Sequence, residues 1–316
     1  MLRIRLTAVL YSIFIISCGG DDDKSTQITE EQRAEWAKIS AVEVNTNRFV
    51  FDALTAGPET GTPVILLHGF PTTSDQYREI LSNLGREGYY AIAPDQRGYS
   101  PGARPTEIEQ YHLQFLTQDI IDIANSLELE NFHLVGHDHG GRVAWAAGAL
   151  HPDKLLSITS ISTSHVKALI QALTNPESDQ TERIVYAQAL NIEGYESELL
   201  ANNNALLLPF YADTDLDLID LYLEKVANEA TLDAALNWYH ASEWQWTYAL
   251  PDITVPTLYI WGDKDLYTGI DAAEATGDFV QGEYTFEILE GASHSIPETR
   301  PAEVTELLLE HFDGRS

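Results

Sequence analysis

An aspartate stands between two glycines at the junction of an apolar run and an alanine-rich run, and this segment constrains the fold most. Residues 131–135 are predicted to form a buried strand and residues 141–150 a helix. Gly136 and Gly140 flank Asp138 with the G-x-D-x-G spacing of a sharp turn between a strand and a helix. Such a turn packs backbone against backbone and leaves no room for a Cβ, so glycine is required on both sides. The segment therefore predicts a strand, a tight turn that carries Asp138 and a helix.

The side chain at this turn determines the chemistry that the chain could perform. A helix that begins just after Asp138 points its N–H groups and its positive dipole end at the carboxylate, which keeps it ionised. A serine at such a turn attacks carbonyl groups. A carboxylate instead displaces a leaving group from a saturated carbon and forms an alkyl ester. Taken alone, the turn leaves open a structural aspartate without any chemical role.

Apolar strands alternate with helical segments along most of the chain. Strands are predicted over residues 41–44, 49–55, 63–67, 89–93, 131–135, 155–162, 256–261 and 284–289. Helices are predicted over residues 74–86, 113–127, 141–150, 271–280 and 301–312. The first two strands read as an antiparallel hairpin, and the later alternation is typical of a mostly parallel sheet covered on both faces. Residues 165–250 lack the strand pattern and are predicted to form an inserted helical cap.

The first 40 residues are predicted to lie outside the fold. The apolar stretch 6–16 is too short to span a bilayer as a mature helix, and arginines precede it. Cys18 follows in a sequence that resembles the lipobox of bacterial lipoproteins, which predicts a signal peptide over 1–17 and lipidation of Cys18. An ordinary signal peptide with a chance cysteine is the alternative. The glycine and acidic run beyond it predicts a flexible tether over 18–40. We expect the protein to be lipid-anchored in the bacterial cell envelope, at the outer membrane or the cell surface.

The charge balance limits the partners that the chain can have. It has 49 acidic and 18 basic residues, for a net charge of −31. This excess argues against nucleic acid and anionic lipid surfaces as partners, so membrane contact is expected only through the N-terminal lipid. Cys18 is the only cysteine, which excludes a disulfide framework. The sequence predicts no oligomeric state.

Polar groups follow several predicted strands at their carboxyl ends, where open parallel sheets bind ligands. Besides Asp138, these groups belong to His68-Gly69-Phe70-Pro71, Gly262-Asp263-Lys264-Asp265 and Gly291-Ala292-Ser293-His294. The chain order of nucleophile, acid and histidine predicts a triad of Asp138, Asp265 and His294. Asp265 is preferred over Asp263, because an acid three residues beyond Gly262 has cleared the strand and can reach the histidine. Asp263 is expected to cap the turn.

Taken together, these motifs resemble a known family. They are His68-Gly69-Phe70-Pro71, Asp95-Gln96-Arg97-Gly98-Tyr99-Ser100, Gly136-His137-Asp138-His139-Gly140-Gly141 and Asn237-Trp238-Tyr239. The set is similar to that of the α/β-hydrolase-fold epoxide hydrolases, which are related to the dehalogenases with an aspartate nucleophile. The resemblance runs from about residue 40 to the C-terminus. It implies an α/β-hydrolase fold with a mostly parallel eight-stranded sheet, a core of residues 41–164 and 251–316, and a helical cap of residues 165–250.

The resemblance also implies site residues. The H-G-x-P turn of the family lends a backbone N–H to an oxyanion hole, here Phe70, and the second donor would be the N–H of His139. Family members use a pair of cap tyrosines to donate hydrogen bonds to the epoxide oxygen. The matching positions are Tyr186 and Tyr239, with packing in the cap core as the alternative for each. Pro71 is expected after a cis bond. The expected substrate contacts are Trp238, His68 and Pro71.

The implied reaction converts a small apolar epoxide to a vicinal diol in two steps. Asp138 attacks a ring carbon and forms an ester, and His294, oriented by Asp265, then activates a water molecule that hydrolyses it. The reaction needs no cofactor. The histidines also lack the spacing of metal ligands, so neither a metal nor a cofactor is predicted.

Other functions stay open. Haloalkane dehalogenases hold the leaving halide with a tryptophan where this chain has His139, which counts against that activity. Fluoroacetate dehalogenases bind the substrate carboxylate with an arginine at the position of Arg142, but their second arginine is again replaced by His139. Dehalogenation is therefore the second hypothesis, and Arg142 is equally compatible with a packing role. A surface-tethered binding protein without turnover is the third.

Overall fold

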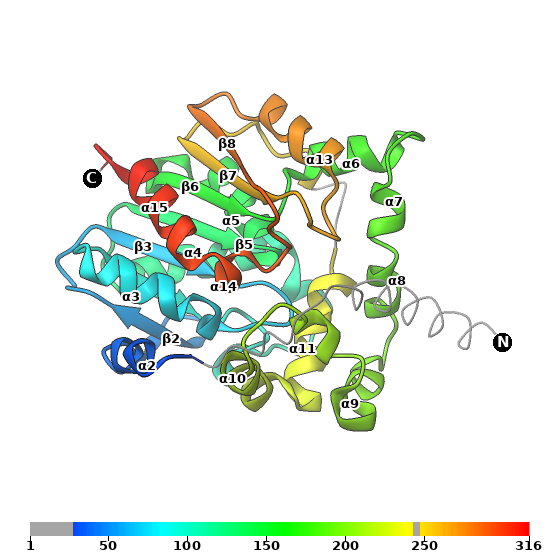
Figure 1. The fold of residues 1–316 in the computed structure, drawn as a ribbon, viewed down its shortest axis with the longest axis horizontal. Coiled ribbons are helices and arrows are strands. Elements are labelled where there is room, and N and C mark those ends of the chain that lie inside the picture. Colours follow the sequence, from blue (N-terminus) through cyan, green and yellow to red (C-terminus); the bar gives the residue numbers. More distant parts are fainter. Residues whose placement is uncertain (1–27, 243–246, 316) are drawn as a thin grey trace.

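The computed structural model describes residues 28–242 and 247–315. Its centre is an eight-stranded sheet with the strand order β1-β2-β4-β3-β5-β6-β7-β8 (Figure 1). The strands are β1 (Ser40–Asn45), β2 (Val50–Ala56), β3 (Pro63–Leu67), β4 (Tyr90–Pro94), β5 (Phe132–His137), β6 (Leu155–Ile161), β7 (Thr257–Gly262) and β8 (Tyr284–Leu289). β2 pairs antiparallel with β1 and β4, and the other neighbours are parallel. The predicted mostly parallel eight-stranded sheet is confirmed.

Helices cover both faces of the sheet (Figure 1). α4 (Leu113–Ser126) packs with α5 (His139–Leu150), and α3 (Arg78–Arg86) packs with α15 (Pro301–Phe312). Further short elements of the core are η1 (Ser74–Tyr77), η2 (Pro101–Ala103), η3 (Ile108–Tyr111), η4 (Pro152–Lys154), α13 (Ile270–Glu274), η6 (Ala275–Phe279) and α14 (Ile296–Thr299). The two helix pairs bury separate apolar clusters, one on each side of the sheet.

β3 shows why an unbroken apolar run forms a central strand. Successive side chains of a strand point to opposite faces. Ile65 and Leu67 belong to the cluster that contains α4 and α5, whereas Val64 and Leu66 belong to the cluster that contains α3 and α15. All four side chains are fully buried. The strand is therefore covered on both faces, as a continuous apolar sequence requires.

The segment before the sheet departs from the predicted tether over 18–40. Within the described part of this segment, α2 (Glu30–Trp36) forms a helix that begins with a capping box between Thr29 and Gln32. Trp36 is buried, and its indole N–H donates to Glu79 Oε2 at 3.1 Å. The prediction of a flexible tether is wrong for these residues, because an apolar side chain anchors the helix to α3.

The predicted helix over 74–86 begins differently from the expectation. Its first turn is the 3₁₀ helix η1, and the cap is Thr73, whose hydroxyl accepts a hydrogen bond from the N–H of Asp75. The N–H of the next residue, Ser74, donates to the buried Asp95 Oδ1 at 2.7 Å. This contact with the end of β4 holds the first turn against the sheet and delays the start of α3.

The insertion between β6 and β7 is helical, as predicted. Its elements are α6 (Val166–Thr174), α7 (Gln180–Arg183), α8 (Tyr186–Leu190), α9 (Glu196–Asn204), η5 (Leu208–Tyr211), α10 (Leu216–Val226) and α11 (Glu229–His240). α8 to α11 lie together beyond one end of the strands, while α6 packs on α13 of the core (Figure 1). The cap therefore stands over the end of the sheet from which the predicted site residues extend.

Ionic and hydrogen-bonding contacts hold the cap on the core. Lys225 of α10 places its ammonium 2.8 Å from Asp75 and 2.9 Å from Asp95, and both carboxylates are buried. The hydroxyl of Tyr211 donates to the carbonyl of Pro71 at 2.8 Å. Buried charges of this kind are stable only with a partner, so these contacts favour one position of the cap.

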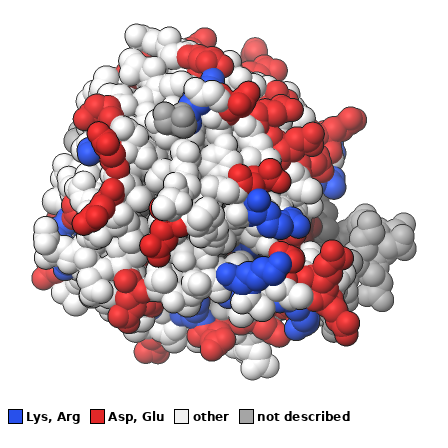
Figure 2. Space-filling view, turned by 90° about the vertical axis from the view of Figure 1, so that its left-hand side faces the viewer, with Lys and Arg blue, Asp and Glu red and all other residues white. Residues whose placement is uncertain are grey.

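On the face that Figure 2 shows, the acidic side chains form several separate groups. Basic side chains are few on the same face, in keeping with the net charge of −31. Among the described residues, no helix is long and apolar enough to cross a membrane.

Candidate active site

The turn after β5 holds Asp138 in a strained backbone conformation. Its φ is 50° and its ψ is −120°, a region that residues with a Cβ rarely occupy. A Cβ on Gly136 would lie 2.2 Å from the carbonyl oxygen of Gly140, and one on Gly140 would lie 2.2 Å from that of Leu67. The predicted need for glycine on both sides is confirmed. The turn thereby lifts the carboxylate out of the sheet at the start of α5.

Backbone and histidine donors surround this carboxylate. The N–H of Phe70 donates to Asp138 Oδ1 at 2.9 Å. His139 is the first residue of α5, so its backbone N–H has no hydrogen-bond partner within the helix. Burial alone would raise the pKa of Asp138, but the neighbouring His139 and His294 outweigh it and lower the pKa below the usual range. Burial lowers the pKa of His139 to about 4, so its imidazole is neutral at pH 7. At neutral pH the positive charge that faces Asp138 is therefore that of His294, and the N–H of Phe70 donates to the same carboxylate.

His294 lies between two carboxylates. Its Nε2 is 3.4 Å from Asp138 Oδ2, and its Nδ1 is 2.8 Å from Asp265 Oδ2. Burial would lower the pKa of His294, but Asp265 and Asp138 overcome this effect and raise the pKa to about 10. The ring is therefore an imidazolium at neutral pH. Removing the negative charge of Asp138 would lower the pKa of His294 and so favour its neutral, basic form.

Asp265 is the acid that orients this histidine. Its side chain is buried, and Oδ1 accepts hydrogen bonds from the N–H groups of Tyr267 at 2.7 Å and Thr268 at 3.0 Å. Asp263 instead accepts from the N–H of Gly291 at 2.6 Å and contacts Lys264. The structure places Asp265 on His294 and Asp263 on the turn, which is the arrangement expected from their spacing to the strand.

The predicted tyrosines enter the same site from the cap. The Tyr239 ring of α11 packs on Phe70 at 5.2 Å and on His139 at 4.5 Å between ring centroids. Tyr186 of α8 lies within hydrogen-bonding reach of Tyr239. Burial, and then the negative charge of Asp138, raise the pKa of Tyr186 well above its usual value, and burial also raises that of Tyr239. Both phenols therefore keep their protons and can donate them.

The polar groups of the three residues expected to contact the substrate, His68, Pro71 and Trp238, form hydrogen bonds within the protein. His68 is fully buried, its Nδ1 lies 2.9 Å from the carbonyl of Gly69, and its Nε2 accepts from the N–H of Gln96 at 3.1 Å. Backbone groups occupy both ring nitrogens of His68, so neither nitrogen is left to bind a substrate. Pro71 follows a cis bond, as predicted, but it is buried and its carbonyl binds the cap. The indole N–H of Trp238 donates to a backbone carbonyl at 2.8 Å, which leaves only its ring for substrate.

A further aromatic residue of the site was not predicted. The Tyr267 ring packs on His294 at 4.7 Å and on Tyr186 at 4.9 Å between centroids. Tyr267 therefore lies between the catalytic histidine and a tyrosine of the cap and contacts both. Its position two residues beyond Asp265, in the same turn, was the signal in the sequence that could have identified it.

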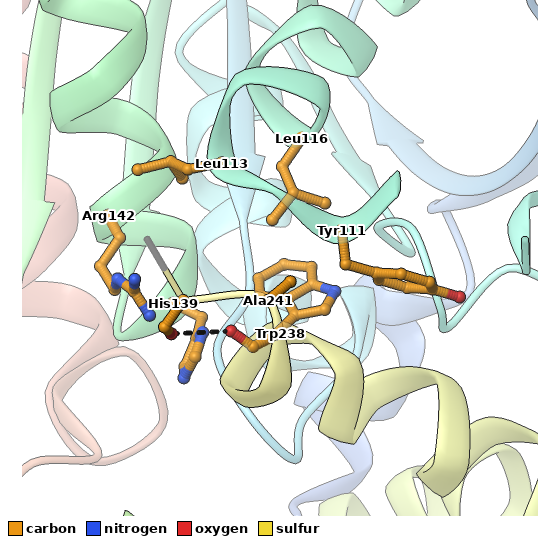
Figure 3. A pocket seen from close by; sticks show the side chains of 8 residues that line it. Tyr111, Leu113, Leu116, His139, Arg142, Trp238 and Ala241 are labelled. Atoms are coloured by element: carbon orange, nitrogen blue, oxygen red, sulfur yellow. Dashed lines mark hydrogen bonds between the residues drawn. The ribbon is translucent and has the colours of Figure 1, made fainter. Parts of the chain in front are cut away.

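Arg142 lies on α5 one turn after Asp138. With His139 and Trp238 it lines a cavity of about 10 Å³, which α4 closes through Leu113 and Leu116 (Figure 3). Arg142 also lines a second cavity of about 60 Å³ between α5 and α6. The guanidinium is therefore directed into the interior beside the nucleophile. Across the described ranges, no group of His, Cys, Asp and Glu side chains could hold a metal ion.

Comparison with known proteins agrees with this geometry. The family model described as alpha/beta hydrolase fold matches residues 62–301. The AB hydrolase superfamily protein YfhM of Bacillus subtilis is 31% identical, over 86% of this chain and 97% of that protein. Epoxide hydrolase A of Mycobacterium tuberculosis is 29% identical, over 86% of this chain and 96% of that protein.

Solved structures share the architecture. A structure described among novel epoxide hydrolases from metagenomes of hot environments superposes with a TM-score of 0.76 and 25% identity, over 87% of this chain and 99% of that one. Epoxide hydrolase A of Mycobacterium thermoresistibile gives a TM-score of 0.69 and 25% identity, over 88% and 99% of the two chains. Both matches span core and cap, since they cover most of each chain.

Proposed function

Because the chain belongs to the alpha/beta hydrolase fold family and is a hydrolase, we propose that it converts epoxides to vicinal diols through an ester on Asp138. The main support is the position of an ionised carboxylate at the strained turn, 3.4 Å from a histidine that a second carboxylate orients. Relatives and solved structures named epoxide hydrolases, similar over most of this chain, support the same substrate class. The motif resemblance is thereby confirmed at the level of the family.

The first half-reaction needs an attacking carboxylate and a proton donor on opposite sides of the ring. Asp138 attacks a ring carbon, the carbon–oxygen bond of the ring breaks, and the departing oxygen takes a proton from Tyr186 or Tyr239. The imidazolium of His294 then gives up its proton, which restores the phenol through solvent. Forming the ester removes the negative charge of Asp138, one of the charges that hold the pKa of His294 at about 10. The histidine is thereby converted from an acid to a base between the steps.

The second half-reaction hydrolyses the ester. Neutral His294, oriented by Asp265, takes a proton from water, and the hydroxide attacks the carbonyl carbon of the ester. The N–H groups of Phe70 and His139 stabilise the oxyanion, each by about 3 kcal/mol. The diol then leaves with the remaining water hydrogen, and Asp138 and His294 return to their charged resting forms.

A direct test measures diol formation by the purified protein with aromatic and aliphatic epoxides. Arg142 beside the nucleophile favours one alternative, release of halide from a haloacid, since a guanidinium binds carboxylates. Fluoride or chloride release from haloacetates or haloalkanes, with no diol from any epoxide, would replace the proposal by that alternative. Absence of both products would favour a binding protein.

Replacing Tyr239 by phenylalanine should slow the alkylation of Asp138 by about 10²-fold, because the variant lacks one of the two proton donors. Ester hydrolysis should change little. Tyr186→Phe should act on the same step. Tyr89→Phe provides a matched control, because Tyr89 directly precedes β4 and packs on His133 and Phe312, at the opposite end of the strands from Asp138. Rapid-quench measurement of the ester separates the steps. Equal slowing of both steps in Tyr239→Phe would contradict the assigned role.

We also propose that the protein is lipid-anchored in the cell envelope. The proposal comes from the sequence, because residues 1–17 and Cys18 lie outside the described residues. Cys18→Ala should abolish incorporation of labelled palmitate and release the protein from the membrane fraction. A wild-type protein that takes up no label would contradict this localisation.

A further inference from the structure

A buried acid outside the reacting groups is connected to the active site through side chains. Glu298 lies on α14, and its Oε1 accepts a hydrogen bond from Gln76 Nε2 at 2.9 Å. The hydroxyl of Tyr222, on cap helix α10, lies 3.5 Å from the same oxygen. Oε2 is buried and has no hydrogen-bond partner among the described residues. A carboxyl group in such a place is costly, so it requires an explanation beyond packing.

Gln76 links this acid to two parts of the site. Gln76 is buried, and both the oxygen and the nitrogen of its side-chain amide form hydrogen bonds. Oε1 accepts from the N–H of Gly69 at 3.3 Å, while Nε2 contacts both Glu298 Oε1 and His137 Nδ1, the latter at 3.0 Å. Gly69 immediately precedes the residue whose N–H binds Asp138. The acceptor Glu298 thus fixes which way the Gln76 amide faces, with its NH₂ toward the acid and its oxygen toward Gly69.

His137 continues the connection to the general base. Its Nε2 is 2.9 Å from the carbonyl oxygen of His294. Because a carbonyl only accepts, Nε2 carries the hydrogen and Nδ1 is left to accept from Gln76. Burial lowers the pKa of His137 to about 4, which keeps the ring neutral and this tautomer intact at pH 7. Ser162 also donates to the carbonyl of His294, at 2.8 Å. The backbone of the catalytic histidine is therefore held from the side of β5 and β6.

We propose that Glu298 is a positioning residue for the catalytic centre, acting through Gln76 on the Phe70 N–H donor and, through His137, on the backbone of His294. The inference rests on the proposed function, because its test measures the rates of alkylation and ester hydrolysis. The contacts of Glu298, Gln76 and His137 themselves do not depend on the substrate. The same oxygen faces Tyr222 of α10, so the connection reaches from the cap to the groups that hold the nucleophile and the base.

The charge state of Glu298 matters little for this role, provided that an oxygen faces Gln76. Burial raises the pKa of Glu298 to about 7. The ionisable groups that face it are Tyr222 of α10, Tyr77 of η1 and, across the site, His294. A glutamine at 298 has the same shape and retains the carbonyl oxygen that accepts from Gln76. It should preserve the position of the amide, whereas leucine should not.

The test compares Glu298→Gln with Glu298→Leu in single-turnover experiments on the full protein. Glu298→Gln should keep alkylation and ester hydrolysis within about 3-fold of wild type. Glu298→Leu should slow ester hydrolysis at least 10-fold. It should leave the substrate Kd, taken from the concentration dependence of the alkylation rate, within about 3-fold, because substrate binding does not involve this carboxyl. Because the charge of Glu298 matters little for this role, the pH profile of hydrolysis should be the same in Glu298→Gln as in the wild type.

Glu79→Leu is the matched control, since Glu79 is a half-buried carboxyl that bonds Trp36 and has no connection to the site. It should lower Tm with unchanged rates.

If Glu298→Leu does not fold, Gln76→Met interrupts the same connection and should give the same kinetic defect. Normal rates in folded Glu298→Leu or Gln76→Met, beside normal wild-type turnover, would overturn the positioning role. A wild type that opens no epoxide would count against the proposed function. Independently of substrate, backbone ¹⁵N shifts of Gly69, Phe70 and His294 that stay unchanged in both Glu298→Leu and Gln76→Met would overturn the positioning role.

Discussion

Replacing His294 by glutamine is expected to stop the reaction after Asp138 has been alkylated. Glutamine cannot take a proton from water, so ester hydrolysis should slow by about 10²–10⁴-fold. Alkylation should persist, because it depends on the carboxylate of Asp138 and on the phenols of the cap. Mass analysis of the intact variant after exposure to an epoxide should show a stable adduct whose mass is that of the substrate, and peptide mapping should locate it on Asp138.

The control for this experiment is His151→Gln, because His151 lies beyond the end of α5 and away from the site. It should turn over normally and retain no adduct. The adduct would also identify accepted substrates in a mixture, since each epoxide adds its own mass. An adduct on a residue other than Asp138, or normal steady-state turnover by His294→Gln, would contradict the assigned role of the histidine.

Replacing Arg97 by methionine is expected to cost about 3–5 kcal/mol of the free energy of unfolding. The guanidinium is 1% exposed and binds Asp119 through both ends, with Nε 2.7 Å from Oδ2 and Nη2 2.6 Å from Oδ1. It also donates to the carbonyl of Gln110. Methionine would leave Asp119 buried with only the half-exposed Arg48 beside it, at 2.9 Å. The loss arises mainly from this uncompensated carboxylate.

Urea unfolding of a matched set measures the effect. Arg33→Met removes an ion pair with Asp217 in which the arginine side chain is 55% exposed, and it should cost no more than about 1 kcal/mol. The double variant Arg97→Met with Asp119→Leu should recover part of the loss, because it removes the buried charge. A loss below about 1 kcal/mol in Arg97→Met, or no recovery in the double variant, would show that this pair does not contribute as described.

Periodicity was sufficient to predict the sheet. β3, β8 and α15 begin and end at the predicted residues, since long apolar runs or an amphipathic repeat stand between clear turn residues. α2 was missed because its polar sequence resembles a linker, although the Thr29–Gln32 capping box was visible. What makes that helix stable is the contact of Trp36 with Glu79, 43 residues away, and local sequence does not contain this information.

The site shows the same division between local and distant signals. Asp138, Asp265 and His294 each follow a strand, so their convergence could be predicted from chain order and topology. His68 also follows a strand, but its position did not reveal that the ring turns toward the backbone of Gly69 and Gln96. The pairing of Gln76 with Glu298 joins residues 222 positions apart and could not be predicted without the fold.

The central claim is that a carboxylate oxygen of Asp138 bonds to the substrate carbon. A single turnover in H₂¹⁸O, with protein in excess over epoxide, tests it most directly. The account predicts an unlabelled first diol and one heavy oxygen in the Asp138 peptide, because water attacks the ester carbonyl and the product keeps an oxygen of the aspartate. A first diol that contains ¹⁸O, with an unlabelled Asp138, would contradict the account.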